Sequence, residues 1–299
     1  MTLDRIGLIG FGEAGGILAQ DLAAQGVTVQ VYDRLLDGPS TRDALAARAA
    51  HAGARLCTSA AEAAAGVPLV ISAVTAGNAL DVARGLAASL RPGQLFMDIN
   101  SVAPATKQAA HHAIAASGAV YIDAAVMAPV PPQRLKTPIL LGGEAAEALC
   151  ALLNARGFAT RVVSAEVGVA SAIKMCRSVM IKGLEALTTE SLRTARHYGA
   201  EAEVLASLHK SFPSMGWDGE LPHYLVSRVA EHGRRRAEEM EEVAETVRAA
   251  GLAPHMSLAT VQAQRGLVDD ITARGLNYAD LEPFDWRRLD ALLRETPGR

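Results

Sequence analysis

The sequence predicts an α/β fold in which a Rossmann-type parallel sheet is followed by an all-helical domain. Short apolar runs alternate with helical segments through the first half of the chain, whereas helical periodicity alone fills the second half. A segment without proline, residues 170–197, predicts one long helix between the two parts. We therefore expect one domain over residues 1–166 and a second over residues 167–299.

Composition excludes several classes of protein. The chain has 299 residues, half of them hydrophobic, and a formal net charge of -3, which gives no basic footprint for nucleic acid. No apolar run is long enough to predict a membrane span, and the first strand begins too early to leave room for a signal peptide. The three cysteines have no metal-ligand spacing, and Cys176 is expected as a small buried hydrophobe. We expect a cytoplasmic protein that requires no metal.

The first apolar run, residues 6–9, leads into a turn with G-x-G-x-x-G spacing and then into a helix. Gly10 allows the sharp exit from the strand, Gly12 keeps a Cβ away from a pyrophosphate, and Gly15 lets the helix pack close to the sheet. An anion would lie at the N-terminus of that helix. The pattern predicts cofactor binding by Gly10, Phe11, Gly12, Glu13, Ala14 and Gly15.

A second strand, residues 27–32, ends at an acid. Asp33 stands about 20 residues beyond the glycines, where a dinucleotide-binding motif places the residue that binds the ribose 2′-OH. Its charge favours NAD, although the neighbouring Arg34 could attract a 2′-phosphate, so NADP stays possible. A glycine-rich turn without a nucleotide is the alternative interpretation.

Further strands are predicted over residues 69–74, 95–99, 120–126, 137–141 and 160–163, with a rigid proline-rich loop at 129–132. The alternation with helices predicts parallel strands. Because ligands bind at the carboxyl ends of such strands, we expect Val74, Thr75 and Asn100 to border the cofactor.

The long helix carries a polar strip. Lys174, Ser178 and Lys182 follow at i, i+4 and i+8 with Arg177 beside them, which could meet a carboxylate or simply form a solvated face. A helix of roughly 40 Å must also cover its apolar faces, so we expect a homodimer.

Four motifs in order resemble the β-hydroxyacid and 6-phosphogluconate dehydrogenase superfamily. After the glycine turn come residues 98–104, similar to D-x-S-T-x-x-P; residues 123–128, similar to D-A-P-V-S-G; and residues 168–174, similar to G-x-G-x-x-x-K. The helical half resembles an uncharacterised carboxy-terminal domain of some members.

The resemblance implies an NAD(P)-dependent dehydrogenase acting on a small carboxylate or polyhydroxy acid, with Lys174 as general acid and base. A lysine base needs a lowered pKa, for which burial, Arg177 and Lys182 are the expected causes. With the polar strip, the resemblance implies these substrate-binding residues: Ser101, Ala125, Met127, Ala128, Arg177 and Ser178. Because Met127, Ala128 and Ser178 replace the family's serine, glycine and asparagine, we expect a substrate other than the usual ones.

Two alternatives stay open at this point. An imine reductase could use the same fold, although a lysine that can lose its proton suits alcohol oxidation better. A dinucleotide-binding sensor or scaffold would need no chemistry at all.

Overall fold

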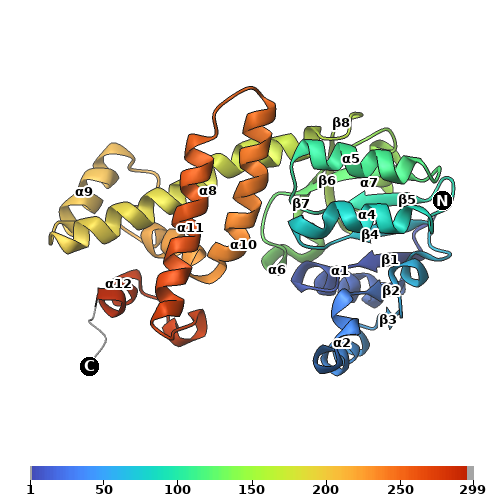
Figure 1. Cartoon of the computed structure of the whole chain (residues 1–299), viewed down its shortest axis with the longest axis horizontal. Coiled ribbons are helices and arrows are strands. Elements are labelled where there is room, and N and C mark those ends of the chain that lie inside the picture. The colour runs from blue at the N-terminus through green and yellow to red at the C-terminus, as the bar shows by residue number, and fades with distance from the viewer. Residues whose placement is uncertain (1, 295–299) are drawn as a thin grey trace. The chain divides into compact units, whose positions relative to one another are not determined.

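The amino-terminal part of the chain forms an eight-stranded sheet in the computed structural model, which describes residues 2–294 (Figure 1). The strand order is β3-β2-β1-β4-β5-β6-β7-β8. The strands are β1 Arg5–Ile9, β2 Thr28–Tyr32, β3 Arg55–Leu56, β4 Leu69–Ser72, β5 Leu95–Asp98, β6 Val120–Val126, β7 Pro138–Gly142 and β8 Ala159–Ser164.

Helices cover both faces of the sheet. Leu69 and Ile71 belong to one buried cluster and Val70 to another, as expected when successive side chains of a strand point to opposite faces. The first cluster includes residues of α1 Glu13–Ala24, α2 Pro39–His51 and α7 Ala146–Asn154; the second includes residues of α3 Ala60–Ala64, α4 Ala79–Ala87 and α5 Pro104–Ala115. This is the doubly wound arrangement that the sequence predicts.

One pairing departs from the prediction of parallel strands. β7 pairs with β6 antiparallel, while β8 pairs with β7 parallel. Only the short helix α6 Val130–Gln133 and the 3₁₀ turn η3 Arg134–Lys136 separate β6 from β7, and a parallel crossover needs a longer connection. The proline-rich stretch avoids the sheet as predicted, but it forms a helical turn with proline near its start rather than a loop.

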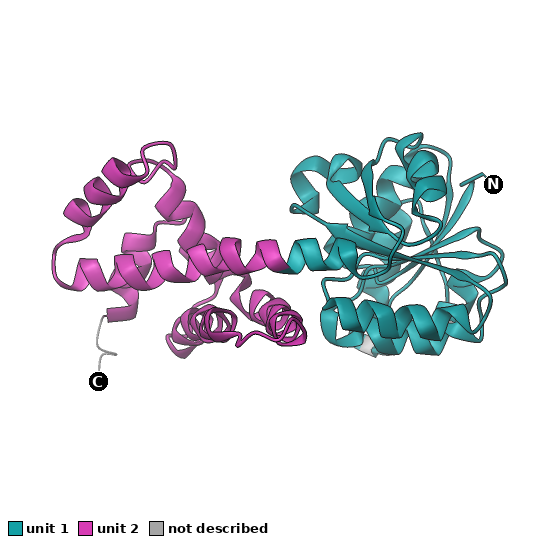
Figure 2. Ribbon diagram, turned by 90° about the horizontal axis from the view of Figure 1, so that it is seen from above, with its two compact units in different colours: residues 1–175 teal, residues 176–299 magenta. Residues whose placement is uncertain are grey.

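The long helix is α8, Val169–His197, which begins one residue before the predicted position. The chain divides into two compact units, residues 1–175 and 176–299, and the division falls within α8 (Figure 2). The boundary predicted near Glu166 lies in the turn between β8 and α8.

The second unit is helical in the part that the structure describes. Besides α8 it contains α9 Glu201–Ser211, α10 Leu221–Ala249, α11 His255–Ala273, the 3₁₀ turn η4 Tyr278–Leu281 and α12 Trp286–Arg294. The breaks predicted at Phe212-Pro213, residues 251–254 and Gly275 separate these helices. Helices α10 and α11 approach closely at Gly233, where a Cβ would overlap the carbonyl oxygen of Gln264. Trp286, Leu192 and Val229 lie in the buried core of this unit.

Candidate active site

Of the three glycines after β1, two are required by the fold and one leaves space for a ligand. Gly10 has a φ of +96°, and a Cβ there would overlap the carbonyl oxygen of Ala73; a Cβ on Gly15 would overlap that of Gly10. The fold itself therefore requires these two glycines. A Cβ on Gly12 would meet nothing within 4 Å. Gly12 thus leaves open space beside the turn, which is the space that a pyrophosphate needs.

The N-terminus of α1 has no side-chain cap. Gly12 is the N-cap residue, and Gly16 donates the first helical hydrogen bond to its carbonyl oxygen at 2.9 Å. Glu13, Ala14 and Gly15 form the first turn, whose N–H groups lack acceptors within the helix and can bind an anion.

Asp33 lies beside this turn at the end of β2. Its Oδ2 accepts a hydrogen bond from the backbone N–H of Phe11 at 2.7 Å, and its Oδ1 accepts one from Leu35 at 3.0 Å. Both bonds orient the carboxylate at the edge where β1 and β2 end. The neighbouring Arg34 is exposed and donates to the side-chain oxygen of Asn78 at 3.0 Å.

The ends of β4 and β5 are joined by Asn100, a buried side chain. Its Oδ1 accepts a hydrogen bond from the N–H of Val74 at 2.6 Å, and its Nδ2 donates to Ser72 Oγ at 3.0 Å. Thr75 follows Val74 and is exposed. Because β2, β1, β4 and β5 are adjacent and parallel, the predicted cofactor residues all lie along one edge of the sheet.

Lys174 and Ser101 meet at this edge. The Nζ of Lys174, which lies six residues after Gly168 on α8, donates to Ser101 Oγ at 2.5 Å. Ser101 is in the loop that follows β5, and both side chains are partly exposed. An ammonium and a hydroxyl in contact can hold and transfer a proton of a bound alcohol.

The residues predicted to bind substrate have different environments. Ala125 is only 1% exposed and packs with Leu140 and Ala170, so its side chain belongs to the core. Met127 and Ala128, which follow β6, are partly exposed. In the second unit Arg177 is exposed and Ser178 is buried.

The polar strip of α8 is solvated only in part, because Arg177 is exposed whereas Ser178 and Lys182 are buried. Lys182 is 5% exposed, and its Nζ lies 2.5 Å from Glu239 Oε2. Burial lowers the pKa of Lys182 and the carboxylate of Glu239 opposes that shift. The charge of Lys182 is thus paired with that of Glu239, and its expected influence on Lys174 stays a prediction. Cys176 is exposed, so its predicted burial is wrong.

Comparison with known proteins agrees with this geometry. The family described as the NAD binding domain of 6-phosphogluconate dehydrogenase matches residues 5–163. The chain belongs to this family. The match confirms the resemblance seen in the sequence and shows that the first unit is a nicotinamide-dinucleotide-binding domain. A domain of unknown function (DUF1932) matches residues 195–267.

Three relatives cover most of the chain. A solved structure of a conserved hypothetical protein from Sinorhizobium meliloti 1021 is 36% identical, covers 98% of this chain and 96% of its own, and has a TM-score of 0.76. The NAD-dependent L-serine dehydrogenase of Pseudomonas aeruginosa is 28% identical over 72% of each chain. The mitochondrial 3-hydroxyisobutyrate dehydrogenase of Drosophila melanogaster is 27% identical over 73% of this chain and 66% of the fly enzyme.

One contact at the dinucleotide-binding edge was not predicted. The guanidinium of Arg48, on α2, donates to the carbonyl oxygens of Phe11 and Gly12 and lies over the Phe11 ring, 5.3 Å from its centroid. Arg48 is exposed on α2. Neither a sequence motif nor an interruption of an apolar pattern distinguishes it from other surface arginines. The structure therefore shows a cation beside the glycine turn, and the sequence alone did not predict it.

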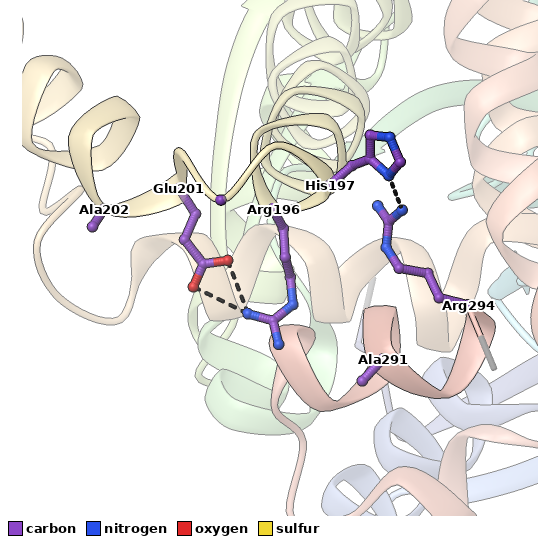
Figure 3. A pocket seen from close by; sticks show the side chains of 7 residues that line it. Arg196, His197, Glu201, Ala202, Ala291 and Arg294 are labelled. Carbon is purple, nitrogen blue, oxygen red and sulfur yellow. Dashed lines mark hydrogen bonds and ion pairs between the residues drawn. The ribbon is translucent and has the colours of Figure 1, made fainter.

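A separate hollow of about 560 Å³ lies in the second unit (Figure 3). Arg196 and Glu201 form an ion pair at 2.9 Å there, and Arg294 contacts His197 Nδ1 at 3.0 Å. The charged groups of the hollow are thus bound to one another and connect the end of α8 with α9 and α12. None of its residues was predicted as part of a site.

Among the described residues, no helix is both long and apolar enough to cross a membrane.

Proposed function

We propose that this protein is an NAD-dependent dehydrogenase that oxidises the CH–OH group of a small hydroxy acid or sugar acid, or catalyses the reverse reduction. The named relatives act on L-serine and 3-hydroxyisobutyrate, and both compounds carry a hydroxyl and a carboxylate on a short carbon skeleton. Family membership and these names support the class of reaction and of substrate.

The contact between Lys174 and Ser101 is the observation that carries the proposal. Its 2.5 Å hydrogen bond joins the Nζ of Lys174, as donor, to the loop after β5, at the edge that bears the proposed cofactor-binding residues. An unreactive dinucleotide-binding protein has no need for a lysine held there.

The proposed chemistry requires two transfers. The glycine turn and Asp33 would hold a nicotinamide dinucleotide, which when bound would supply the acceptor for the hydride of the substrate carbon. Lys174, unprotonated at that moment, takes the hydroxyl proton, and in the reverse direction it returns the proton to the carbonyl oxygen. Ser101 holds the Nζ of Lys174 in place, and Met127, Ala128, Arg177 and Ser178 are the proposed substrate contacts. Ala125 shapes this region through its packing.

The geometry of Asp33 favours NAD over NADP. Its carboxylate is fixed by two backbone N–H groups at the end of β2, where it can accept a hydrogen bond from a ribose 2′-OH and would repel a 2′-phosphate. Arg34, the residue that could attract a phosphate, is bound to Asn78.

The second unit supports a homodimer. On α8, Ser178, Lys182 and Glu185 are buried, whereas Met180 is 73% exposed and Leu187 is 55% exposed. Large apolar side chains exposed on a helix are covered by an apolar partner in many proteins, and a second copy would supply one. Light scattering should give a particle of twice 31.3 kDa; a particle of 31.3 kDa would contradict the dimer.

Substrate screening tests the proposed activity. The wild-type protein would be mixed with NAD⁺ or NADP⁺ and with L-serine, 3-hydroxyisobutyrate or 6-phosphogluconate, and formation of the reduced cofactor followed by its absorbance. We expect turnover with at least one hydroxy acid. An imine reductase would show none on these alcohols but would oxidise NADPH with a cyclic imine. Saturable NAD⁺ binding without turnover on any substrate would favour the sensor.

A further inference from the structure

Two buried carboxylates lie on adjacent strands, Asp98 at the end of β5 and Asp123 in the middle of β6. Asp98 and Asp123 are register partners on adjacent parallel strands, so their side chains point to the same face of the sheet. Asp98 is 1% exposed and Asp123 is 0% exposed. Two like charges in this position repel one another strongly unless a cation lies between them.

Lys107 supplies that cation from α5. Its side chain is fully buried, and its Nζ lies 3.0 Å from Asp98 Oδ1 and 3.5 Å from Asp123 Oδ1. The same Nζ donates to the backbone carbonyl oxygens of Asp98 at 2.6 Å and of Ala124 at 3.4 Å. One ammonium therefore binds oxygens of both strands.

Asp123 in turn holds the beginning of α8. Gly168 directly precedes that helix and has no side chain with which to cap it. Asp123 Oδ2 accepts hydrogen bonds from the N–H groups of Gly168 at 3.0 Å and Ser171 at 3.1 Å, and its Oδ1 accepts one from Ser171 Oγ at 2.6 Å. A residue 45 positions away in the sequence thus takes the role of the N-cap. Ser171 is three residues before Lys174, hence on the same side of the helix.

Asp98 orders the loop after β5, which carries Ser101. Its Oδ1 accepts a hydrogen bond from the N–H of Asn100 at 2.8 Å, and its Oδ2 accepts one from the hydroxyl of Tyr121 at 2.7 Å. Burial and the charge of Asp98 raise the pKa of Tyr121 well above its ordinary value, so this hydroxyl stays a donor. These bonds fix the loop that carries Ser101.

We propose that Lys107 is a positioning residue that sets the contact between Ser101 and Lys174. Its ammonium joins the strand end that carries the Ser101 loop to the carboxylate that caps the helix carrying Lys174. The inference rests on the proposed function for its effect on turnover, whereas the link between Lys107 and the first turn of α8 stands on geometry alone.

Three substitutions test the link: Lys107→Met, Asp123→Asn and Ser171→Ala. The matched control is Gln94→Met, which removes a buried side chain that makes three hydrogen bonds at the opposite end of β5. Lys107→Met leaves two buried carboxylates without a cation; if it fails to fold, Asp123→Asn and Ser171→Ala, which keep side-chain volume nearly unchanged, carry the test.

The first readout needs no substrate. Amide hydrogen exchange in residues 169–175 should quicken in each variant relative to α1, by up to roughly 30-fold, the limit set by complete loss of a helix cap. The reactivity of Lys174 toward acetic anhydride, measured by mass spectrometry across pH, should also change. In Gln94→Met the exchange of residues 169–175 relative to α1 and the reactivity of Lys174 should both stay as in the wild type. Unaltered exchange and reactivity in folded Lys107→Met or Asp123→Asn would overturn the proposal.

The second readout uses the best hydroxy acid from the substrate screen. A reacting group displaced by about 1 Å loses roughly 100-fold in rate, so kcat should fall by roughly 10- to 100-fold in Asp123→Asn while KM for NAD⁺ stays near the wild-type value. A fall in kcat in Gln94→Met as large as that in Asp123→Asn would show a general loss of stability instead and overturn the positioning role. If the wild type turns over no substrate, the proposed function fails, and the exchange and labelling results still decide the link.

Discussion

Replacing Gly12 by alanine should weaken cofactor binding more than it weakens the fold. A Cβ at this position meets no protein atom within 4 Å, and Gly12 has a φ of -73°, which alanine adopts readily. Alanine is a poorer N-cap residue than glycine, so the free energy of unfolding should fall by about 1 kcal/mol.

The added methyl group would instead meet the pyrophosphate. Forcing a methyl group into a filled space typically costs about 1–3 kcal/mol, which corresponds to a roughly 5- to 150-fold weaker binding of NAD⁺. Isothermal titration calorimetry measures that affinity, and chemical denaturation of the same sample measures stability.

Gly15→Ala is the matched control, because its Cβ would overlap the rigid backbone carbonyl of Gly10. That variant should lose stability by about 1–3 kcal/mol or more even without cofactor. Unchanged NAD⁺ affinity in folded Gly12→Ala would refute the position assigned to the pyrophosphate.

Three further outcomes follow from the structure. Asp33→Asn removes the charge that repels a 2′-phosphate, so the ratio of kcat/KM for NAD⁺ over NADP⁺ should fall roughly 10- to 150-fold, the scale of a charged hydrogen bond; an unchanged ratio would show that Asp33 does not read the ribose. Lys182→Met removes the 2.5 Å partner of Glu239 but leaves Arg235 at 2.8 Å, so denaturation should show a loss smaller than the roughly 3–5 kcal/mol of an unpaired buried charge, while kcat per folded molecule stays near wild type; a kcat as low as that of a Lys174 variant would contradict this. Burial and then the charges of Arg228, Arg235 and Arg236 lower the pKa of His232 to about 4, despite the opposing carboxylates of Glu239 and of Glu231 at 3.2 Å. Its folded pKa lies below its unfolded value of about 6.5, so stability should fall as pH drops from 6.5 to 4, by roughly 1–2 kcal/mol after solvent screening, and His232→Gln should flatten that fall in a thermal melt.

The nucleotide-binding edge could be predicted from the sequence because its signals are local. Glycine spacing, the acid at the end of the second strand and the boundaries of α8 depend on residues that are close along the chain. The same reasoning correctly brought Val74 and Asn100 to one edge, since parallel strands end together.

Other features depend on distant partners. Lys107 lies on the buried side of α5 with Ala110 and Ile114. In the sequence a single lysine there only interrupts an apolar stripe and does not indicate a buried ion-pair site. Its carboxylates lie 9 and 16 residues away on two strands, and their register is set only by folding. Lys182 was placed on a polar strip, yet its burial depends on Glu239, 57 residues further on.

The direction of β7 follows from length. The segment between β6 and β7 is too short for a crossover helix, and counting its residues would have predicted the antiparallel pairing. The small elements β3 and α3 carry little periodicity and follow from pairing with β2 and packing against β1.

The central claim is that Lys174 handles the proton during NAD-dependent oxidation of a hydroxy acid. The most direct measurement compares kcat of Lys174→Met with that of the wild type on the best substrate from the screen, with NAD⁺ affinity measured on both. We predict a fall in kcat of roughly two to four orders of magnitude with NAD⁺ affinity near the wild-type value. Turnover within a few-fold of wild type would contradict the claim and require another proton acceptor.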